Sequence, residues 1–147
     1  MQVEIFCDGA CIPNPGHMGI GIVLGDETRT VARYLGLGTN QIAELEALKA
    51  SLTLAMAGDT IFSDSNYALK VTTGLWRPKI HFDLIEELQQ IFKTACATLR
   101  WVRGHGGHPL QELADRLAKR AAISRRSEID SPAGLLSGRG LGESGHD

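Results

Sequence analysis

The chain has 147 residues, of which 43% are hydrophobic and 22% are charged, a composition typical of one globular domain rather than of a disordered or fibrous chain. It contains no apolar run long enough to span a membrane and no basic-then-apolar leader, so we expect a cytoplasmic protein without a membrane partner. Its three cysteines form no CxxC pair, which argues against a structural zinc site or a disulfide framework.

The formal net charge of −2 hides an asymmetry along the chain. Residues 1–64 carry three basic and eight acidic side chains, a net of −5, whereas the rest carry twelve basic and nine acidic ones, a net of +3. Such a division fits a cation site beside a surface that meets phosphates. Charged helix faces exposed to water would produce the same pattern, so charge alone leaves both interpretations open.

The first third of the chain predicts three sequential antiparallel strands. Residues 2–8 alternate loosely between apolar and polar side chains and predict a first strand that ends at Asp8. Residues 19–25 and 28–38 predict the second and third strands, with polar residues between them.

A change of period then marks the first long helix. Apolar residues recur at helical spacing over residues 39–58, where Thr39 or Asn40 can cap the start and Gly58 can end the helix. Residues 59–64 form a short apolar run that predicts a fourth strand, which ends in an aspartate.

Helices and strands alternate in the remainder of the predicted domain. In order, we expect a short helix at 65–74, a connection at 75–80, an amphipathic helix at 82–95, a strand at 97–102, a Gly-rich loop at 103–109 and a last helix at 110–123. An antiparallel start followed by alternation implies a mixed sheet with helices packed on it. Residues 124–147 are rich in Gly and Ser without a period, so we predict a domain at 1–123 and a flexible tail at 124–147.

Four acidic residues lie near the ends of predicted elements and beside small residues: Asp8, Glu44, Asp64 and Asp115. In open sheets, binding sites form at strand ends where small side chains leave space, as expected at Asp8 and Asp64. Converging carboxylates repel one another and would bind protons unless a cation lies between them. A single acid of this kind is usually a cap or a surface charge, but four of them indicate a shared site.

The donor set suggests which cation such a site would hold. Oxygen ligands without a cysteine or histidine cluster favour Mg²⁺, with Mn²⁺ as the alternative. Two such ions, about 3.5–4 Å apart, stabilise both the attacking and the leaving oxygens of an in-line displacement at phosphorus. The acidic set therefore predicts phosphoryl chemistry that depends on two metal ions.

Four separated segments resemble, in order and in internal spacing, the successive motifs of type 1 ribonuclease H. They read FCDGACIPNPGHMGIGIVL, TNQIAELEAL, FSDSNYAL and WVRGHGGHPLQELADRLA. The resemblance runs from about Val3 to about Ala122 and leaves out the C-terminal segment. It implies an α/β ribonuclease H-like fold, a five-stranded mixed sheet with three antiparallel strands first and then two parallel ones, flanked by helices.

The resemblance also implies an endoribonuclease that hydrolyses the RNA strand of RNA/DNA hybrids and leaves 5′-phosphate and 3′-hydroxyl ends. Four acids match the catalytic, metal-binding carboxylates of the family: Asp8, Glu44, Asp64 and Asp115. Glu112 matches a position that lies close to the metals without being a ligand. We expect the chain to act as a monomer.

His105 matches the histidine of a mobile loop in the family, and we expect this residue to shuttle a proton or to help the product leave. Glycines on both sides of it should allow the loop to move. A loop histidine that only caps a turn is the structural alternative. His108, which Pro109 follows, is expected to set the start of the last helix.

Five further residues match positions that contact substrate in the family: Asn14, Thr39, Asn40, Gln41 and Asn66. Short amides suit the shallow minor groove of a hybrid because they donate to and accept from RNA 2′-hydroxyls. Gln41 departs from the commoner asparagine, and Thr39 is placed to meet a phosphate of the DNA strand. Asn14 and Asn40 are also ordinary turn and capping residues, and both roles can coexist.

The connection between the second and third helices departs from many bacterial members, which carry a basic helix and loop there. This chain has only TTGLWRPKIHF, in which Trp76, Arg77 and Lys79 remain. The resemblance is therefore closer to the form that lacks the basic protrusion. Weaker affinity for hybrids is expected unless the basic last helix or the tail compensates.

Two alternative functions remain open. The chain could be a noncatalytic RNA/DNA hybrid-binding module of the same fold, but such a module is expected to lose a metal carboxylate and none is missing. It could also be a nuclease of this fold that acts on DNA junctions or single strands, which the amide residues argue against.

Overall fold

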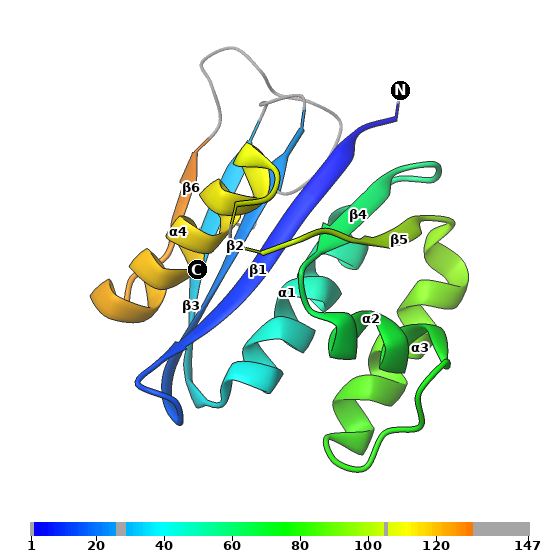
Figure 1. The fold of residues 1–147 in the computed structure, drawn as a ribbon, viewed down its shortest axis with the longest axis horizontal. Coiled ribbons are helices and arrows are strands. Elements are labelled where there is room, and N and C mark those ends of the chain that lie inside the picture. Colours follow the sequence, from blue (N-terminus) through cyan, green and yellow to red (C-terminus); the bar gives the residue numbers. More distant parts are fainter. Residues whose placement is uncertain (1, 26–28, 105, 131–147) are drawn as a thin grey trace.

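The computed structural model describes residues 2–25, 29–104 and 106–130. They form one sheet and four helices (Figure 1). The elements follow in the order β1 (Glu4–Ile12), β2 (Gly16–Leu24), β3 (Thr30–Gly38), α1 (Asn40–Leu54), β4 (Thr60–Ser63), α2 (Asn66–Thr73), α3 (Phe82–Ala95), β5 (Thr98–Trp101), α4 (Pro109–Ser124) and β6 (Glu128–Asp130). Within these ranges, no helix is both long and apolar enough to cross a membrane.

The sheet has the strand order β5-β4-β1-β2-β3-β6. β1, β2 and β3 pair antiparallel in sequence, and β4 and β5 join parallel to β1 and to each other, as predicted. The prediction of five strands was wrong by one, because β6 pairs antiparallel with β3 and places Ile129 opposite Val31. A strand of three residues is too short to show alternation in the sequence. The division at residue 123 remains a prediction, and residues 131–147 lie outside the described part.

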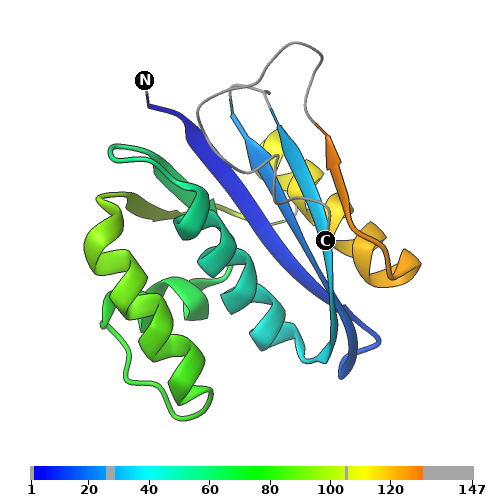
Figure 2. The same ribbon diagram turned by 180° about the vertical axis from the view of Figure 1, so that it is seen from behind.

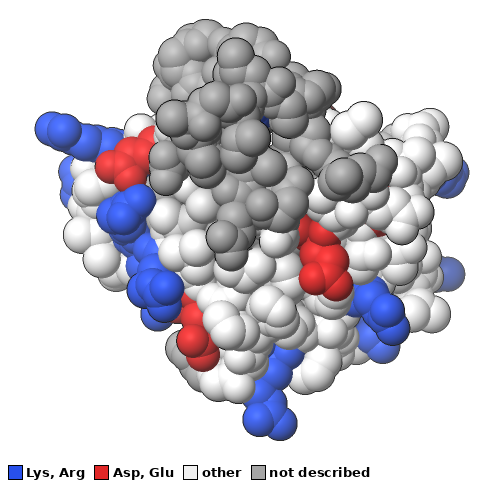
Figure 3. Space-filling model, turned by 90° about the horizontal axis from the view of Figure 1, so that it is seen from above, with Lys and Arg blue, Asp and Glu red and all other residues white. Residues whose placement is uncertain are grey.

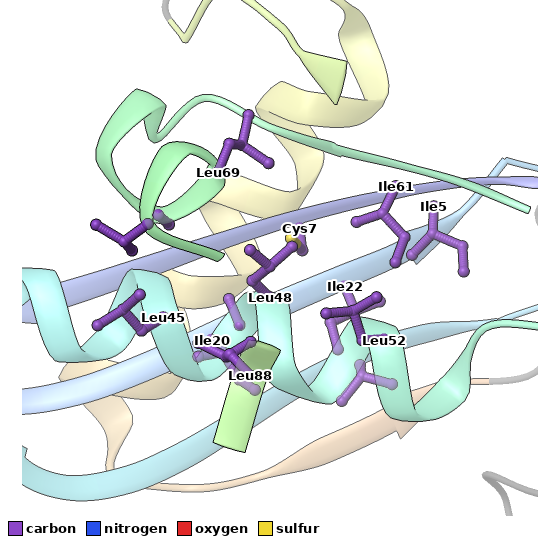
Figure 4. Close-up of a cluster of buried hydrophobic side chains, with 14 of the residues drawn as sticks. Ile5, Cys7, Ile20, Ile22, Leu45, Leu48, Leu52, Ile61, Leu69 and Leu88 are labelled. Atoms are coloured by element: carbon purple, nitrogen blue, oxygen red, sulfur yellow. The ribbon is translucent and has the colours of Figure 1, made fainter. Parts of the chain in front are cut away.

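The helices cover both faces of the sheet (Figures 1 and 2). α1, α2 and α3 pack on one face, where the larger core cluster includes Ile5 and Cys7 of β1 and Leu45 and Leu48 of α1. Figure 4 shows these side chains filling the space between β1, β2 and α1. Phe6 points to the other face, toward α4, because successive strand residues alternate in direction.

α4 lies unusually close to the sheet because glycines of β2 lie beneath it. A Cβ atom added to Gly21 would collide with the backbone carbonyl of Ala114, and one added to Gly19 would collide with that of Ala118. Gly21 is also the residue of β2 that lies opposite Asp8 of β1. The close contact therefore brings the backbone of α4 near Asp8.

Two element ends differ from the prediction by four residues each. β1 does not end at Asp8 but continues to Ile12, because β2 pairs with it along its whole length. α1 ends at Leu54 rather than at Gly58. The next residues turn instead toward Asp59, whose buried carboxylate accepts hydrogen bonds from the N–H groups of Met56 and Val3 at 2.9 and 3.0 Å.

Candidate active site

Three of the predicted carboxylates converge in the structure. Asp8 projects from the middle of β1, Glu44 from the second turn of α1, and Asp64 from the residue after β4. One carboxylate oxygen of each lies within 4.8 Å of the other two. The fold thus brings together acids that are far apart in the sequence.

An opening in the sheet makes room for this cluster. β1 pairs with β4 only as far as Cys7, which lies opposite Ser63, and then continues without β4 to Ile12. The chain leaves β4 in a tight turn in which Ser63 Oγ accepts from Ser65 N–H at 3.0 Å. Because two parallel strands part at this point, side chains from the helices on both faces can reach the exposed edge of β1.

Glu44 enters this opening from α1 and is held by the backbone of β1. Its Oε1 accepts from Gly9 N–H at 3.1 Å. α1 can approach so closely because Gly9 has no side chain, and a Cβ atom there would collide with the backbone of Ala43. The N-cap of α1 is Thr39, whose Oγ1 accepts from Ile42 N–H at 3.2 Å.

Asp115 approaches from the opposite face, on α4. Its carboxyl group lies near enough to Asp8 for hydrogen bonding and charge to raise the pKa of Asp8. One of its oxygens, however, is 3.1 Å from the ammonium group of Lys119, one helical turn later. Asp115 therefore borders the cluster of three acids and is shared between Asp8 and Lys119.

Burial and mutual repulsion favour the protonated forms of Asp8 and Glu44 in the absence of a cation. Burial, together with the charges of Glu44 and Asp64, raises the pKa of Asp8 to about 11. Burial and the charge of Asp64 raise the pKa of Glu44 to about 8, although the hydrogen bond from Gly9 opposes this rise.

The donor set fits a hard divalent cation. Asp8, Glu44 and Asp64 offer only carboxylate oxygens, which are the preferred ligands of Mg²⁺ and Mn²⁺. A cation would also offset the repulsion among these carboxylates. These three residues, with Asp115 at their border, are the ones that could hold it.

The Gly-rich loop after β5 passes beside the cluster. A Cβ atom on Gly104 would lie 2.8 Å from Oδ2 of Asp64, and Trp101 Nε1 donates to the carbonyl of Asp64 at 3.3 Å. The predicted catalytic residue His105 lies outside the described residues, so its role remains a prediction.

The start of α4 agrees with the expectation for His108. This residue is the N-cap, and its Nδ1 accepts from Leu110 N–H at 3.0 Å. Its ring also stacks on Phe6, with centroids 4.6 Å apart. Glu112 lies in the first turn of α4, and its expected place near the metals remains a prediction.

The predicted substrate-contacting residues lie at a turn and at two helix starts. Asn14, in the turn between β1 and β2, accepts from Asn40 N–H through its Oδ1 at 3.1 Å. Gln41 is exposed in the first turn of α1, and Asn66 is the exposed first residue of α2. Asn14, Thr39, Asn40 and Gln41 therefore lie close together, and no contact described here joins Asn66 to them.

Gln111 is a residue of the site region that the sequence did not reveal. Its side chain is only 1% exposed, and its Nε2 donates to the carbonyl of Cys7 at 2.9 Å. A glutamine two residues after a helix N-terminal proline is usually exposed, so no pattern indicated its burial. The structure shows that it ties α4 to β1 next to Asp8.

The chain is similar to known proteins over most of its length. The family model for RNase H matches residues 1–123. A ribonuclease H of Geotalea uraniireducens is 37% identical over 140 residues, which cover 84% of this chain and 95% of that protein.

Solved structures agree with this match. The crystal structure of RNase H1 from Halobacterium salinarum superposes with a TM-score of 0.69 at 26% identity and covers 86% of this chain and all of that one. LC11-RNase H1, solved in complex with an RNA/DNA hybrid, has the same fold, with a TM-score of 0.70 at 22% identity, and covers 84% of this chain and 98% of that one. With its sheet order, its converging acids and these relatives, the chain belongs to the ribonuclease H family of hydrolytic endonucleases.

Proposed function

We propose that this protein hydrolyses the RNA strand of RNA/DNA hybrids with two divalent cations, Mg²⁺ in the first place, and leaves 5′-phosphate and 3′-hydroxyl ends. The observation that carries the proposal is the convergence of Asp8, Glu44 and Asp64 within 4.8 Å. Membership in the ribonuclease H family supports the same reaction. LC11-RNase H1, which shares the fold, forms a complex with such a hybrid.

The acids have the task of holding the cations in a fixed place. When bound, two such ions supply charge stabilisation for the oxygens that enter and leave in an in-line displacement at phosphorus. Asp8, Glu44 and Asp64 would hold them, and Asp115 would complete the set once its oxygen is released from Lys119. The hydrogen bond from the N–H group of Gly9 orients the Glu44 carboxylate toward the opening.

Polar groups at the start of α1 and α2 are suited to the nucleic-acid backbone. The amides of Asn14, Asn40, Gln41 and Asn66 can meet 2′-hydroxyls in the minor groove of the hybrid. Thr39 caps the N-terminus of α1, where the helix dipole favours a phosphate. The exposed positions of the four amides support this role.

Basic residues on α4 supply attraction that does not depend on sequence. Arg116, Lys119 and Arg120 are exposed along this helix. Figure 3 shows Lys and Arg side chains, interrupted by acidic ones, on the side of the molecule where α4 lies in Figure 1. Contacts between such a row and phosphates would weaken as salt concentration rises.

The decisive experiment compares labelled RNA/DNA, RNA/RNA and DNA/DNA duplexes with Mg²⁺ or Mn²⁺. We expect the wild type to cleave the hybrid only when a divalent ion is present. Asp64→Asn should lower the rate by about 100-fold or more, because it removes one charge from the cluster. Asp83→Asn makes the same change on an exposed aspartate of α3 and should leave the rate unchanged.

Two outcomes would overturn the proposal. Cleavage that persists in excess chelator would rule out the metal-dependent mechanism. Hybrid binding without cleavage in either ion would replace the proposed enzyme with a noncatalytic hybrid-binding module.

A further inference from the structure

The exposed edge of β1 presents two backbone groups where β4 is missing. The Val3 carbonyl, which accepts from Thr60 N–H at 3.1 Å, marks the side of β1 that faces β4. Backbone groups in a strand alternate in direction, so the Cys7 carbonyl and the Gly9 N–H point to the same side. They flank Asp8 in the sequence, at the point where pairing with β4 stops.

Side chains from opposite faces of the sheet form hydrogen bonds with these two backbone groups. Glu44 of α1 accepts from Gly9 N–H at 3.1 Å. Gln111 of α4 donates to the Cys7 carbonyl at 2.9 Å. The two helices are thereby attached to β1 on either side of Asp8, and each of them carries one of the acids of the site.

The geometry of α4 couples Gln111 to Asp115. The two residues are four apart, so they lie on the same face of the helix. Gln111 is buried, and among the described residues its Oε1 has no hydrogen-bond partner. A buried amide that keeps one unpaired oxygen is costly. The bond to Cys7 is the only described hydrogen bond of its side chain, which indicates that the residue serves the placement of α4 rather than stability alone.

We propose that Gln111 is a positioning residue that sets the separation between Asp115 and Asp8, and through it the affinity of the site for its cations. The inference rests on the proposed function. Loss of the amide donor would release the start of α4 from β1, and Asp115 would then lie farther from Asp8. An error of about 1 Å in such a placement can lower a rate by about 100-fold.

The test compares Gln111→Met with a matched control elsewhere in the fold. Gln89 of α3 makes the same kind of bond, from its Nε2 to the Val71 carbonyl at 2.9 Å, away from the acids. Gln111→Met should weaken Mn²⁺ binding, measured by titration calorimetry without nucleic acid, by about fivefold or more. It should lower kcat on the hybrid by about tenfold or more and change KM by less than about twofold, because it leaves the exposed substrate contacts intact.

Gln89→Met should lower the thermal midpoint without changing Mn²⁺ affinity or kcat per folded molecule. A Gln111→Met variant with wild-type Mn²⁺ affinity and kcat, or an equal loss in Gln89→Met, would overturn the inference. Because Mn²⁺ binding is measured without a hybrid, failure of the inference and failure of the proposed function can be told apart.

A measurement on the wild type keeps the inference testable if Gln111→Met does not fold. Side-chain amide signals are resolved in ¹H–¹⁵N spectra. The signals of Gln111 should shift when Mg²⁺ is added, while those of Gln89 should stay in place. Gln111 signals that do not respond to saturating Mg²⁺ would contradict the proposed coupling.

Discussion

Asp8 and Glu44 show how the fold prepares individual residues for a cation. Both carboxyl groups are removed from water and lie beside further acids, and the pKa of each is raised well above its ordinary value. The folded protein without a cation therefore binds more protons than the unfolded chain from about pH 4 upward. As a result, the cluster opposes folding at neutral pH until a cation replaces these protons.

This excess of protons predicts a pH-dependent response to metal. The raised pKa values of Asp8 and Glu44 favour the folded state at low pH. The thermal midpoint of the metal-free protein should therefore decrease as the pH is raised from 5 to 9. The rise in midpoint on adding Mg²⁺ should grow over the same range, because protons and Mg²⁺ compete for the same oxygens. Circular dichroism melts with and without Mg²⁺ measure both trends.

The variant Asp8→Asn supplies the control for this prediction. It removes the carboxyl group that must take up a proton on burial, so the metal-free protein should become more stable at pH 8, by about 1 kcal/mol or more. The response to Mg²⁺ should largely disappear. A Mg²⁺-induced rise of the same size at every pH would contradict the assignment of the protons to this cluster.

At the scale of single residues, the sequence indicated which acids form the site but not which residues hold them in place. Asp8, Glu44 and Asp64 could be selected because they stand beside small residues in recognisable motifs. The side chain of Gln111 could not, because only the packing of α4 on β1 removes it from water. The salt bridge between Asp115 and Lys119 follows ordinary helical spacing, but whether Asp115 faces the cluster or solvent depends on how α4 is rotated.

Among the elements, α4 depends most on a close fit to the sheet. Gly21 allows its backbone to approach β2 directly opposite Asp8. A larger residue there would press against a backbone carbonyl, which cannot move aside as the end of a flexible side chain can. The position of α4 therefore depends on the lack of a side chain at Gly21.

The substitution Gly21→Ala should destabilise the protein by about 2–3 kcal/mol, the upper part of the usual cost of overpacking. It should also lower kcat on the hybrid, because α4 and Asp115 are displaced. Urea unfolding and steady-state kinetics provide the two measurements.

Gly36→Ala is the comparison variant for this prediction. Gly36 has a φ angle of 89° and open space around it, so alanine should cost about 1–2 kcal/mol from backbone strain alone. Its kcat per folded molecule should equal that of the wild type. A Gly21→Ala protein with normal kcat would show that the close contact of α4 matters only for stability.

Local sequence patterns predicted which segments are helices and which are strands, but they did not predict where several of these elements end. The apolar period of α1 and the short helix expected at 65–74 are present in the structure, where Ser65 and Gly74 cap α2. α1 stops at Leu54, four residues before Gly58, because buried Asp59 binds the N–H group of Met56. That contact depends on tertiary packing, which periodicity alone cannot show.

At the scale of the whole molecule, the sheet extends beyond the five strands that were predicted. β6 covers the edge of β3, and Ser127 Oγ accepts from Tyr34 N–H at 2.9 Å. Arg120 of α4 also pairs with Glu128 at 2.6 Å, although both side chains are exposed and such pairs contribute little. The segment after α4 thus completes the antiparallel side of the sheet.

Truncated chains distinguish the contribution of β6 to stability from that of the residues that follow it. A chain that ends at Asp130 keeps every contact described here and should retain the free energy of unfolding of the full chain. A chain that ends at Ser124 loses β6 and the bond to Tyr34, and should be less stable by about 1–2 kcal/mol. Urea unfolding of the three chains is the measurement, and equal stability of all three would show that β6 does not contribute.

The mixed α/β class could be predicted because strands and helices alternate after an antiparallel start. The opening between β1 and β4 could not, because it depends on how far two strands remain paired after they have been brought together. Local sequence determines which segments become strands, but the point where two of them separate is a property of the assembled sheet.

The acids around that opening are far apart along the chain, and this spacing determines when the site can form during synthesis. The acids of the site come from the first strand, the first helix, the end of the fourth strand and the last helix, so a chain that stops before Asp115 does not hold them all. Contacts between such distant segments form late, after long loops have closed. A polypeptide that is being synthesised and still lacks α4 therefore lacks the complete set of acids.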